Sequence, residues 1–291
     1  MIVWLDGPGE VADRDRGPEV REIGSRAVAL SRLRGRGVPL PHGFVLGRTL
    51  FNEFTAALHR ESQKSPPKLA PQVLKEIARA IEALGGSVAI RRSPLGGNLH
   101  SGVWQVVSGG RPERETYLHL TDAAEVHEAV RRIWGGGAGG SSPIPVAIVV
   151  QRFMQPEVSA VARRDPPDAD VLQVQSTLGI GDLLAAGLVV PDRHTIRIRD
   201  GVVLASSLGR KAQMTVARPD GGTMRVPVPA SSARTIALDN AKLAQIAALW
   251  RAAEDALGGL TQMAMGWGQG HWYVTSVIEA QSPAASDVLL G

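Results

Sequence analysis

Two arginine sites in the sequence are suited to binding an anion. Arg26 comes two residues after Gly24, where the spacing of apolar residues predicts that a helix begins. The backbone amides at such a helix start can bind an anion. Arg91 and Arg92 end an apolar segment that predicts a buried strand opening into a glycine-rich loop. A guanidinium group suits the recognition of an anion through two parallel hydrogen bonds. A buried ion pair and a solvated strand end are the alternatives for Arg91, and a surface position is the simpler interpretation of Arg92.

Composition narrows the class of protein. The chain has 291 residues, of which 32 are basic and 28 acidic, and its net charge of +4 is spread along the sequence. This charge does not indicate a nucleic-acid-binding surface. Most of the basic residues are arginines; an arginine-rich coding bias is the simpler explanation, and anion binding is the alternative. The absence of cysteine excludes disulfides, thiolate nucleophiles and thiolate metal sites.

The sequence indicates neither a leader nor a membrane anchor. Asp6 lies in the first ten residues, and no long apolar stretch follows it, so we expect no signal peptide. No apolar run approaches the ~20 residues needed to span a bilayer. We therefore expect a cytoplasmic protein without membrane or nucleic-acid partners.

Helical and strand-like periodicities alternate irregularly along the chain, which favours an α+β fold. The Gly- and Ser-rich segment 135–142 is expected to be a flexible connector and hinge. Helices are expected over 25–33, 50–58, 74–84, 124–134 and 240–257, and strands over 2–5, 39–46, 87–94, 117–120, 146–152, 171–175 and 195–199, with a hairpin of 262–265 and 272–277.

Seven blocks of residues follow one another in the order of the motifs of a known family. Arg163-Arg-Asp-Pro stands where that family has T-x-D-P. The other blocks are Gly24-Ser-Arg-Ala-Val-Ala-Leu-Ser-Arg-Leu with Gly37-Val-Pro-Leu-Pro-His-Gly-Phe-Val, Val88-Ala-Ile-Arg-Arg-Ser, Val149-Val-Gln-Arg-Phe-Met, Leu178-Gly-Ile-Gly-Asp, Val190-Pro-Asp-Arg-His and Trp272-Tyr-Val-Thr-Ser-Val-Ile. Together they resemble the N-terminal ATP-binding domain of the phosphoenolpyruvate synthase and pyruvate phosphate dikinase family, which has the ATP-grasp fold. Rifampin phosphotransferase carries the same domain, so the resemblance does not identify the phosphate acceptor.

The resemblance implies a single ATP-grasp domain over residues 1–285, with lobes of about 1–110 and 111–285 around a nucleotide cleft and a tail of 286–291. It implies ATP as the ligand. In the family, the phosphates reach a histidine on a separate swivelling domain, and the 291 residues show no such domain. We therefore expect that a protein carrying the acceptor or phosphohistidine domain could be a partner.

Most acidic residues of the family's site are replaced. The family's D-x-E pair aligns with Gln262 and Ala264, and its Q-x-R pair aligns with Ser276 and Ile278. One further glutamate aligns with Gln175, and the acids after the arginine strand align with Gly97 and Asn98. Since Mg²⁺ is held by charged oxygen ligands, these replacements argue against a magnesium site. The resemblance leaves Arg26, Arg91, Lys211, Gln175 and Gln262 as candidate nucleotide ligands.

Each remaining candidate has a simpler structural interpretation. Lys211 matches a family G-x-K and could contact phosphate, but an exposed loop lysine is the simpler expectation. The acids Asp165, Asp182 and Asp192 are typical of turns and caps. Glu279 could replace a lost acid only through a shift of strand register. The histidines His100, His194 and His271 lack metal-ligand spacing, and the tryptophans Trp250, Trp267 and Trp272 are expected to pack in the core or on the hairpin, with base stacking as the alternative.

Three interpretations of function remain. The first is a nucleotide-binding protein whose phosphotransfer is altered or lost. The second is an active phosphotransferase or ligase that uses relocated acids or a partner's acceptor domain. The third is a structural or regulatory protein with an empty cleft. Since function depends on the site and not on the fold, the fold alone does not separate them. ATP binding with and without magnesium is the observation that does.

Overall fold

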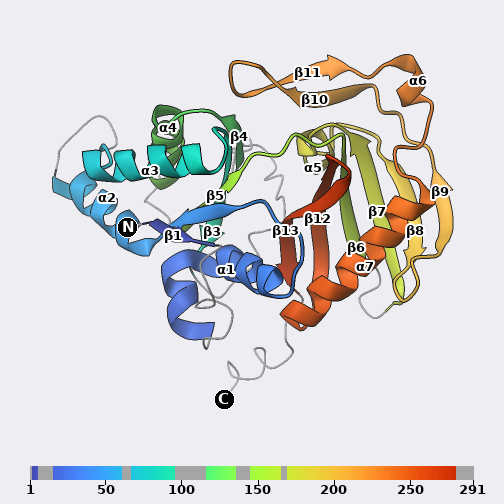
Figure 1. Ribbon diagram of the computed structural model, residues 1–291, viewed down its shortest axis with the longest axis horizontal. Helices are drawn as coiled ribbons and strands as arrows, with labels where there is room; N and C mark the ends of the chain where they lie inside the picture. Colours follow the sequence, from blue (N-terminus) through green and yellow to red (C-terminus); the bar gives the residue numbers. More distant parts are fainter. Residues whose placement is uncertain are drawn as a thin grey trace. The chain divides into compact units, whose positions relative to one another are not determined.

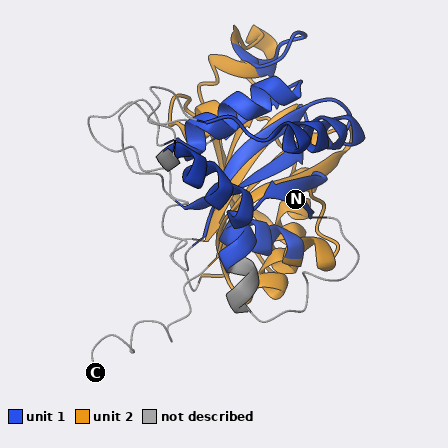
Figure 2. Cartoon of the chain, turned by 90° about the vertical axis from the view of Figure 1, so that its left-hand side faces the viewer, with its two compact units in different colours: residues 1–31, 41–155, 216–224 blue, residues 32–40, 156–215, 225–291 orange. Residues whose placement is uncertain are grey.

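The computed structural model describes residues 2–5, 16–60, 67–95, 116–135, 145–164 and 169–279. The expected hinge beyond Gly135 lies outside these residues, as do Gly97, Asn98, His100 and Asp165. The chain divides into two compact units, coloured separately in Figure 2. Unit 1 comprises residues 1–31, 41–155 and 216–224, and unit 2 comprises 32–40, 156–215 and 225–291. Each unit is made of three separate segments that alternate along the sequence, whereas each expected lobe, 1–110 and 111–285, is one continuous segment.

Unit 1 contains a five-stranded sheet in the order β1-β2-β5-β3-β4, in which all neighbouring strands are antiparallel. Its apolar core lies on one side, where Phe44, Ile90 and Ile148 pack with α2–α4 around the buried Trp134. The strands are β1 Ile2–Trp4, β2 Gly43–Leu46, β3 Val88–Pro94, β4 Thr116–Leu120 and β5 Val146–Arg152, and the helices are α1 Arg16–Gly35, α2 Arg48–Arg60, α3 Pro71–Ala83 and α4 Ala123–Trp134.

Unit 2 contains a six-stranded antiparallel sheet in the order β13-β12-β6-β7-β8-β9 (Figure 1). A hairpin of β10 and β11 is shared between the two units, since residues 216–224 are assigned to unit 1. The elements are β6 Val158–Arg164, β7 Val171–Leu178, α5 Asp182–Ala185, β8 Asp192–Arg197, β9 Val203–Ser207, β10 Gln213–Ala217, β11 Thr223–Pro227, α6 Ala230–Ala233, α7 Asn240–Leu257, β12 Leu260–Gly268 and β13 His271–Glu279.

Helix α7 covers one face of the six-stranded sheet (Figure 1). It begins after Asp239, whose carboxylate accepts a hydrogen bond from the Lys242 amide at 2.8 Å, and it ends at Gly258 in the left-handed conformation. Trp250 on its inner side is fully buried, and the guanidinium of Arg164 lies 5.8 Å from the Trp250 ring. Arg164 also forms an ion pair with Glu254 at 2.5 Å. Even-numbered residues of β6 therefore face α7, and odd-numbered residues face away from it.

The sequence predicted most of these elements, and α7 has the expected bounds. Strands β6, β9, β10 and β11 and the short helices α5 and α6 were not anticipated. Among the described residues, no helix combines the length and the apolar composition that crossing a membrane requires.

Candidate functional site

The expected helix start at Gly24 is present in unit 1. Within α1, Gly24 has φ 80° and ψ 161°, so the helical conformation is interrupted there and resumes at Ser25. A Cβ atom on Gly24 would lie 2.4 Å from the carbonyl oxygen of Ser93, which no side chain tolerates. The Ala27 amide donates a hydrogen bond to Ser93 Oγ at 3.1 Å. The helix start is thus fixed to the end of β3, and one of the amides expected to face an anion is already used.

Arg26 and Arg91 lie on the same side of β3. Arg26 Nη1 donates to the carbonyl of Arg92 at 2.7 Å, and Arg91 Nη1 donates to Gln151 Oε1 at 3.3 Å. Arg91 alternates with Ser93, whose side chain contacts α1, so Arg91 also faces α1. Gln151 is buried and comes from the motif on β5, and it therefore orients Arg91. Both side chains are partly exposed, which suits a ligand-binding role.

The four positions that align with the family's acid pair and its Q-x-R pair form one cross-strand set in unit 2. Gln262 on β12 lies opposite Ile278 on β13, and Ala264 lies opposite Ser276. Residues that are directly opposite, and residues two apart on one strand, share a face of the sheet. The alignment by motifs therefore corresponds to a real spatial cluster. Within it stand an amide, two apolar side chains and a hydroxyl.

The same face continues across β6, β7 and β8. Gln262 is paired with Arg163 and Arg163 with Gln173, while Ala264 is paired with Val161 and Val161 with Gln175. Gln175 is in turn opposite Arg193. We call this face, defined by Arg163, Gln173, Gln175, Arg193, Gln262, Ala264, Ser276 and Ile278, the polar face. It is the face directed away from α7.

Sequence reasoning missed Arg163 as a residue of this face. Its Nε donates to Gln262 Oε1 at 2.7 Å, and no further side-chain hydrogen bond or ion pair of Arg163 occurs within the described chain. The sequence could have indicated Arg163, because it aligns with the threonine of the family's T-x-D-P motif. Arg193 is exposed, and its guanidinium has no hydrogen-bond or ion-pair partner within the same described ranges.

The residues of the polar face do not fit a magnesium ion. A hard cation prefers charged oxygen ligands, and this face offers amides, a hydroxyl and two guanidinium groups. Residues 2–5, 16–60, 67–95, 116–135, 145–164 and 169–279 contain no group of three His, Cys, Asp or Glu side chains that could hold a metal. Glu279 does not join the face, because β13 alternates regularly from Ile278 to Glu279, and the extra residue at that end of the hairpin lies on β12.

The expectation that Lys211 is an exposed loop lysine is wrong. Its side chain is fully buried, and its ammonium lies 2.5 Å from Oδ1 of the equally buried Asp192. The same carboxylate accepts the Gly209 amide on Oδ1 and the Ala237 amide on Oδ2, each at 2.8 Å. One ion pair therefore joins two of the family motifs, Pro-Asp-Arg-His and Gly-Arg-Lys. Sequence spacing could not show this, because packing brings the two residues together across 19 positions.

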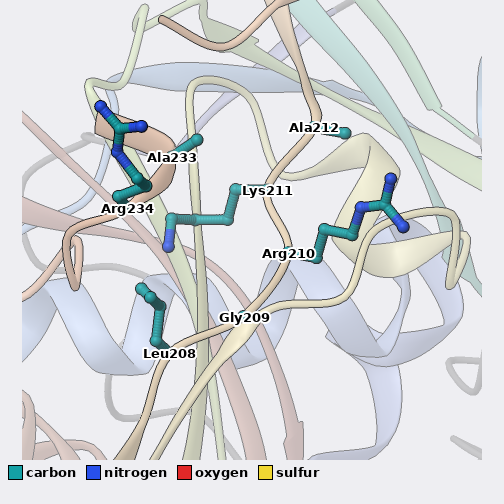
Figure 3. A pocket seen from close by; sticks show the side chains of 7 residues that line it. All are labelled: Leu208, Gly209, Arg210, Lys211, Ala212, Ala233 and Arg234. Atoms are coloured by element: carbon teal, nitrogen blue, oxygen red, sulfur yellow. The ribbon is translucent and has the colours of Figure 1, made fainter. Parts of the chain in front are cut away.

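A pocket of about 410 Å³ in unit 2 is lined by the same segment (Figure 3). The side chains of Arg210 and Lys211 extend to opposite sides of the backbone, and Arg234 stands at the pocket with Ala233 (Figure 3). Since the Lys211 ammonium is held by Asp192, the cationic groups left to this pocket are Arg210 and Arg234, both exposed. No acid–base pair lines it.

His194 is buried beside the Asp192–Lys211 pair. Its Nδ1 lies 2.8 Å from Ser206 Oγ, and its Nε2 has no partner within the described ranges. Burial lowers the pKa of His194 below its usual value; Asp192 opposes this shift and Lys211 adds to it. His194 is therefore a core residue whose charged form burial disfavours, in keeping with the expectation that the isolated histidines are structural.

The tryptophans have packing roles. Trp250 and Trp272 are buried, and Trp267 packs edge-on against Trp272 with ring centroids 5.5 Å apart. The alternative of base stacking is therefore closed to Trp250, which has no exposed surface.

Comparison with known proteins supports the same family. Residues 140–272 match the model of the pyruvate phosphate dikinase AMP/ATP-binding domain. A probable phosphoenolpyruvate synthase from Archaeoglobus fulgidus is 23% identical over 303 residues, covering 88% of this chain and 38% of that protein. A rifampicin phosphotransferase from Streptomyces sviceus is 26% identical over 208 residues, covering 66% of this chain and 23% of that protein. The chain thus spans well under half of the length of either relative.

A solved D-alanine–D-alanine ligase from Bacillus anthracis is similar with a TM-score of 0.40 and 12% identity, covering 87% of this chain and 56% of that one. At this level of similarity, nothing about the chain is inferred from the ligase. The family match and the two sheets with their helices confirm the α+β class and the family expected from the motifs. Residues 140–272 are thus similar to the pyruvate phosphate dikinase AMP/ATP-binding domain family.

Proposed function

We propose that the chain binds ATP without a magnesium ion held by carboxylates, and that its phosphotransfer is altered or lost. The family match supports nucleotide binding. The proposal that no carboxylate holds magnesium rests on the cross-strand set of Gln262, Ala264, Ser276 and Ile278, which has four neutral side chains, two of them at the positions of the family's acid pair. Neutral oxygens hold magnesium weakly, so the phosphates must be held by cations of the protein itself.

The proposed nucleotide ligands are Arg26, Arg91, Gln175 and Gln262. Arg91 is the strongest of them, because Gln151 fixes its orientation and a guanidinium forms bidentate bonds to phosphate. Lys211 does not contact the nucleotide in this proposal. By pairing with Asp192, it fixes the position of the segment that begins at Gly209.

Isothermal titration of the purified chain with ATP tests this proposal, with Arg91→Ala as the variant. Removing one charge-assisted contact costs about 1.5–3 kcal/mol, so the affinity should fall roughly tenfold to a hundredfold. Arg36→Ala, at an exposed turn of unit 2, is a charge-matched control and should leave the affinity unchanged. Equal binding by the parent and Arg91→Ala would refute the assignment. No ATP binding by the parent would favour the interpretation as a structural or regulatory protein.

One observation favours the second interpretation, an active phosphotransferase. Oδ1 of Asp182, at the start of α5, is buried without a hydrogen-bond partner in the described part of the chain. A carboxylate oxygen left in this way could serve a metal or a proton transfer. Magnesium-dependent ATP turnover that Asp182→Asn abolishes would establish that activity and replace our proposal.

A further inference from the structure

We infer that Arg163 takes the electrostatic place of the metal on the polar face, so that the site prefers free ATP over its magnesium complex. The inference deepens the proposed function and rests on it. Arg163 is partnered with Gln262, the residue at the family's aspartate position, and it occupies the family's threonine position. A cation thus stands directly beside the point where a carboxylate is missing.

The hydrogen bond to Gln262 fixes the Arg163 guanidinium without neutralising it. Among the contacts with described residues, Arg163 uses only its Nε, at 2.7 Å from Gln262 Oε1, which leaves the two terminal amino groups as donors. Gln262 is neutral, so the positive charge remains available to a phosphate oxygen. With an aspartate at residue 262 the same contact would be an ion pair, and the charge would be largely cancelled.

Arg193 extends the cationic surface across the sheet. It lies on β8, separated from Arg163 by β7, where its neighbour is Gln175. The strand spacing and the two-residue offset put the two Cα atoms about 10 Å apart across the sheet and about 7 Å apart along it. Two arginine side chains can reach one polyphosphate chain between them. The glutamines Gln173 and Gln175 on β7 supply neutral hydrogen-bond donors along this path.

The net charge of the polar face predicts whether magnesium strengthens or weakens the binding of ATP. The polar face carries two guanidinium groups and no carboxylate. Free ATP is more negative than its magnesium complex, so it interacts more strongly with such a surface. Magnesium would therefore compete with the protein for the phosphates. In a site with acids the sign is reversed, because there the metal bridges two anionic partners.

The test compares ATP affinity in EDTA and in excess magnesium for the parent and two variants. Arg163→Thr restores the family residue alone. The triple change Arg163→Thr, Gln262→Asp and Ala264→Glu restores the acid pair as well. Arg36→Thr removes the same charge at an exposed turn and serves as the control. Thermal melting verifies that each variant is folded before titration.

For the parent we expect magnesium to weaken binding several-fold. Arg163→Thr should lose about tenfold in affinity in EDTA and most of its sensitivity to magnesium. The triple variant should bind ATP more tightly with magnesium than without. A parent that binds ATP through Arg91, with Arg163→Thr indistinguishable from Arg36→Thr, would overturn this inference and leave the proposed function standing. A folded parent that binds no ATP would overturn both.

Discussion

The buried pair of Asp192 and Lys211 has a larger part in the structure than the sequence suggested. The carboxylate accepts two backbone amides and one ammonium, and the pair has no exposed surface. A residue of this kind is recognised in a sequence only as a motif, because its burial depends on packing between distant segments. Arg91 was expected at the end of a strand, but it lies in the middle of β3, paired with Thr116 on β4 and Val149 on β5, and its partner Gln151 came from another motif.

Breaking the buried pair should destabilise the fold strongly. Lys211→Met leaves the Asp192 carboxylate buried without its cation, which costs about 3–5 kcal/mol. The neighbouring Arg210→Met, at an exposed position, should change stability by less than about 0.5 kcal/mol. Urea unfolding monitored by circular dichroism measures both. Similar midpoints for the two variants would contradict the buried pair.

Buried His194 predicts a pH dependence of stability. Its pKa is lowered in the folded state, mainly by burial, so the unfolded chain binds the proton more readily. The stability from this group is fully present above pH 6.5, the unfolded value, and is lost as the pH falls below it. In His194→Gln, the decline in unfolding free energy between pH 7 and 5 should be shallower than in the parent. An unchanged slope would show that His194 does not contribute.

At the scale of elements, the sequence predicted what depends on local periodicity and missed what depends on partners. The helix over 240–257 has a capping aspartate and a terminal glycine and was predicted with its bounds. Strand β6 was missed, although it lies in the middle of the six-stranded sheet, because its alanines and arginines carry no strong strand signal. With β6 missing, Arg163 could not be placed beside Gln262. The cross-strand register was therefore the decisive information for the site.

The close contact between α1 at Gly24 and β3 at Ser93 is a second feature at the scale of elements. Gly24→Ala would impose a backbone conformation that costs about 1–3 kcal/mol for a residue with a side chain, and its Cβ would also clash with the Ser93 carbonyl. We expect a loss of at least about 3 kcal/mol in unfolding free energy and a loss of ATP affinity as Arg26 moves. Gly37→Ala, at φ 75° with open space around it, should cost only about 1–2 kcal/mol and spare ATP binding. Equal costs in urea unfolding would mean that the close contact with β3 is unimportant.

At the scale of the whole molecule, each of the two units has its own candidate residues for nucleotide binding. In unit 1, Arg26 lies just after the helix break at Gly24 and Arg91 lies within β3; in unit 2, the polar face has no carboxylate. The family resemblance could be predicted from the order of the motifs, and the α+β class from the irregular alternation of helical and strand-like segments. The cationic replacement on the polar face could not, since it depends on which strands are neighbours.

The loss of several charged groups predicts weak catalysis by the chain. Each group that stabilises developing charge in a transition state typically contributes about 10²–10³ in rate, and such contributions are not additive. Release of phosphate or AMP from ATP should therefore be slower by at least about a hundredfold than in an active relative carrying the acids. A coupled assay with purified chain measures this. Robust turnover abolished by Asp182→Asn or Glu279→Gln would show that a relocated acid holds the metal.

The affinity of the purified chain for ATP in EDTA, compared with that in excess magnesium, tests most directly whether cations of the protein hold the phosphates. We predict that ATP binds in EDTA and that magnesium does not strengthen the binding, because guanidinium groups hold the phosphates. Binding that appears only when magnesium is added would contradict it, since such a site must contain acidic ligands that the polar face does not have.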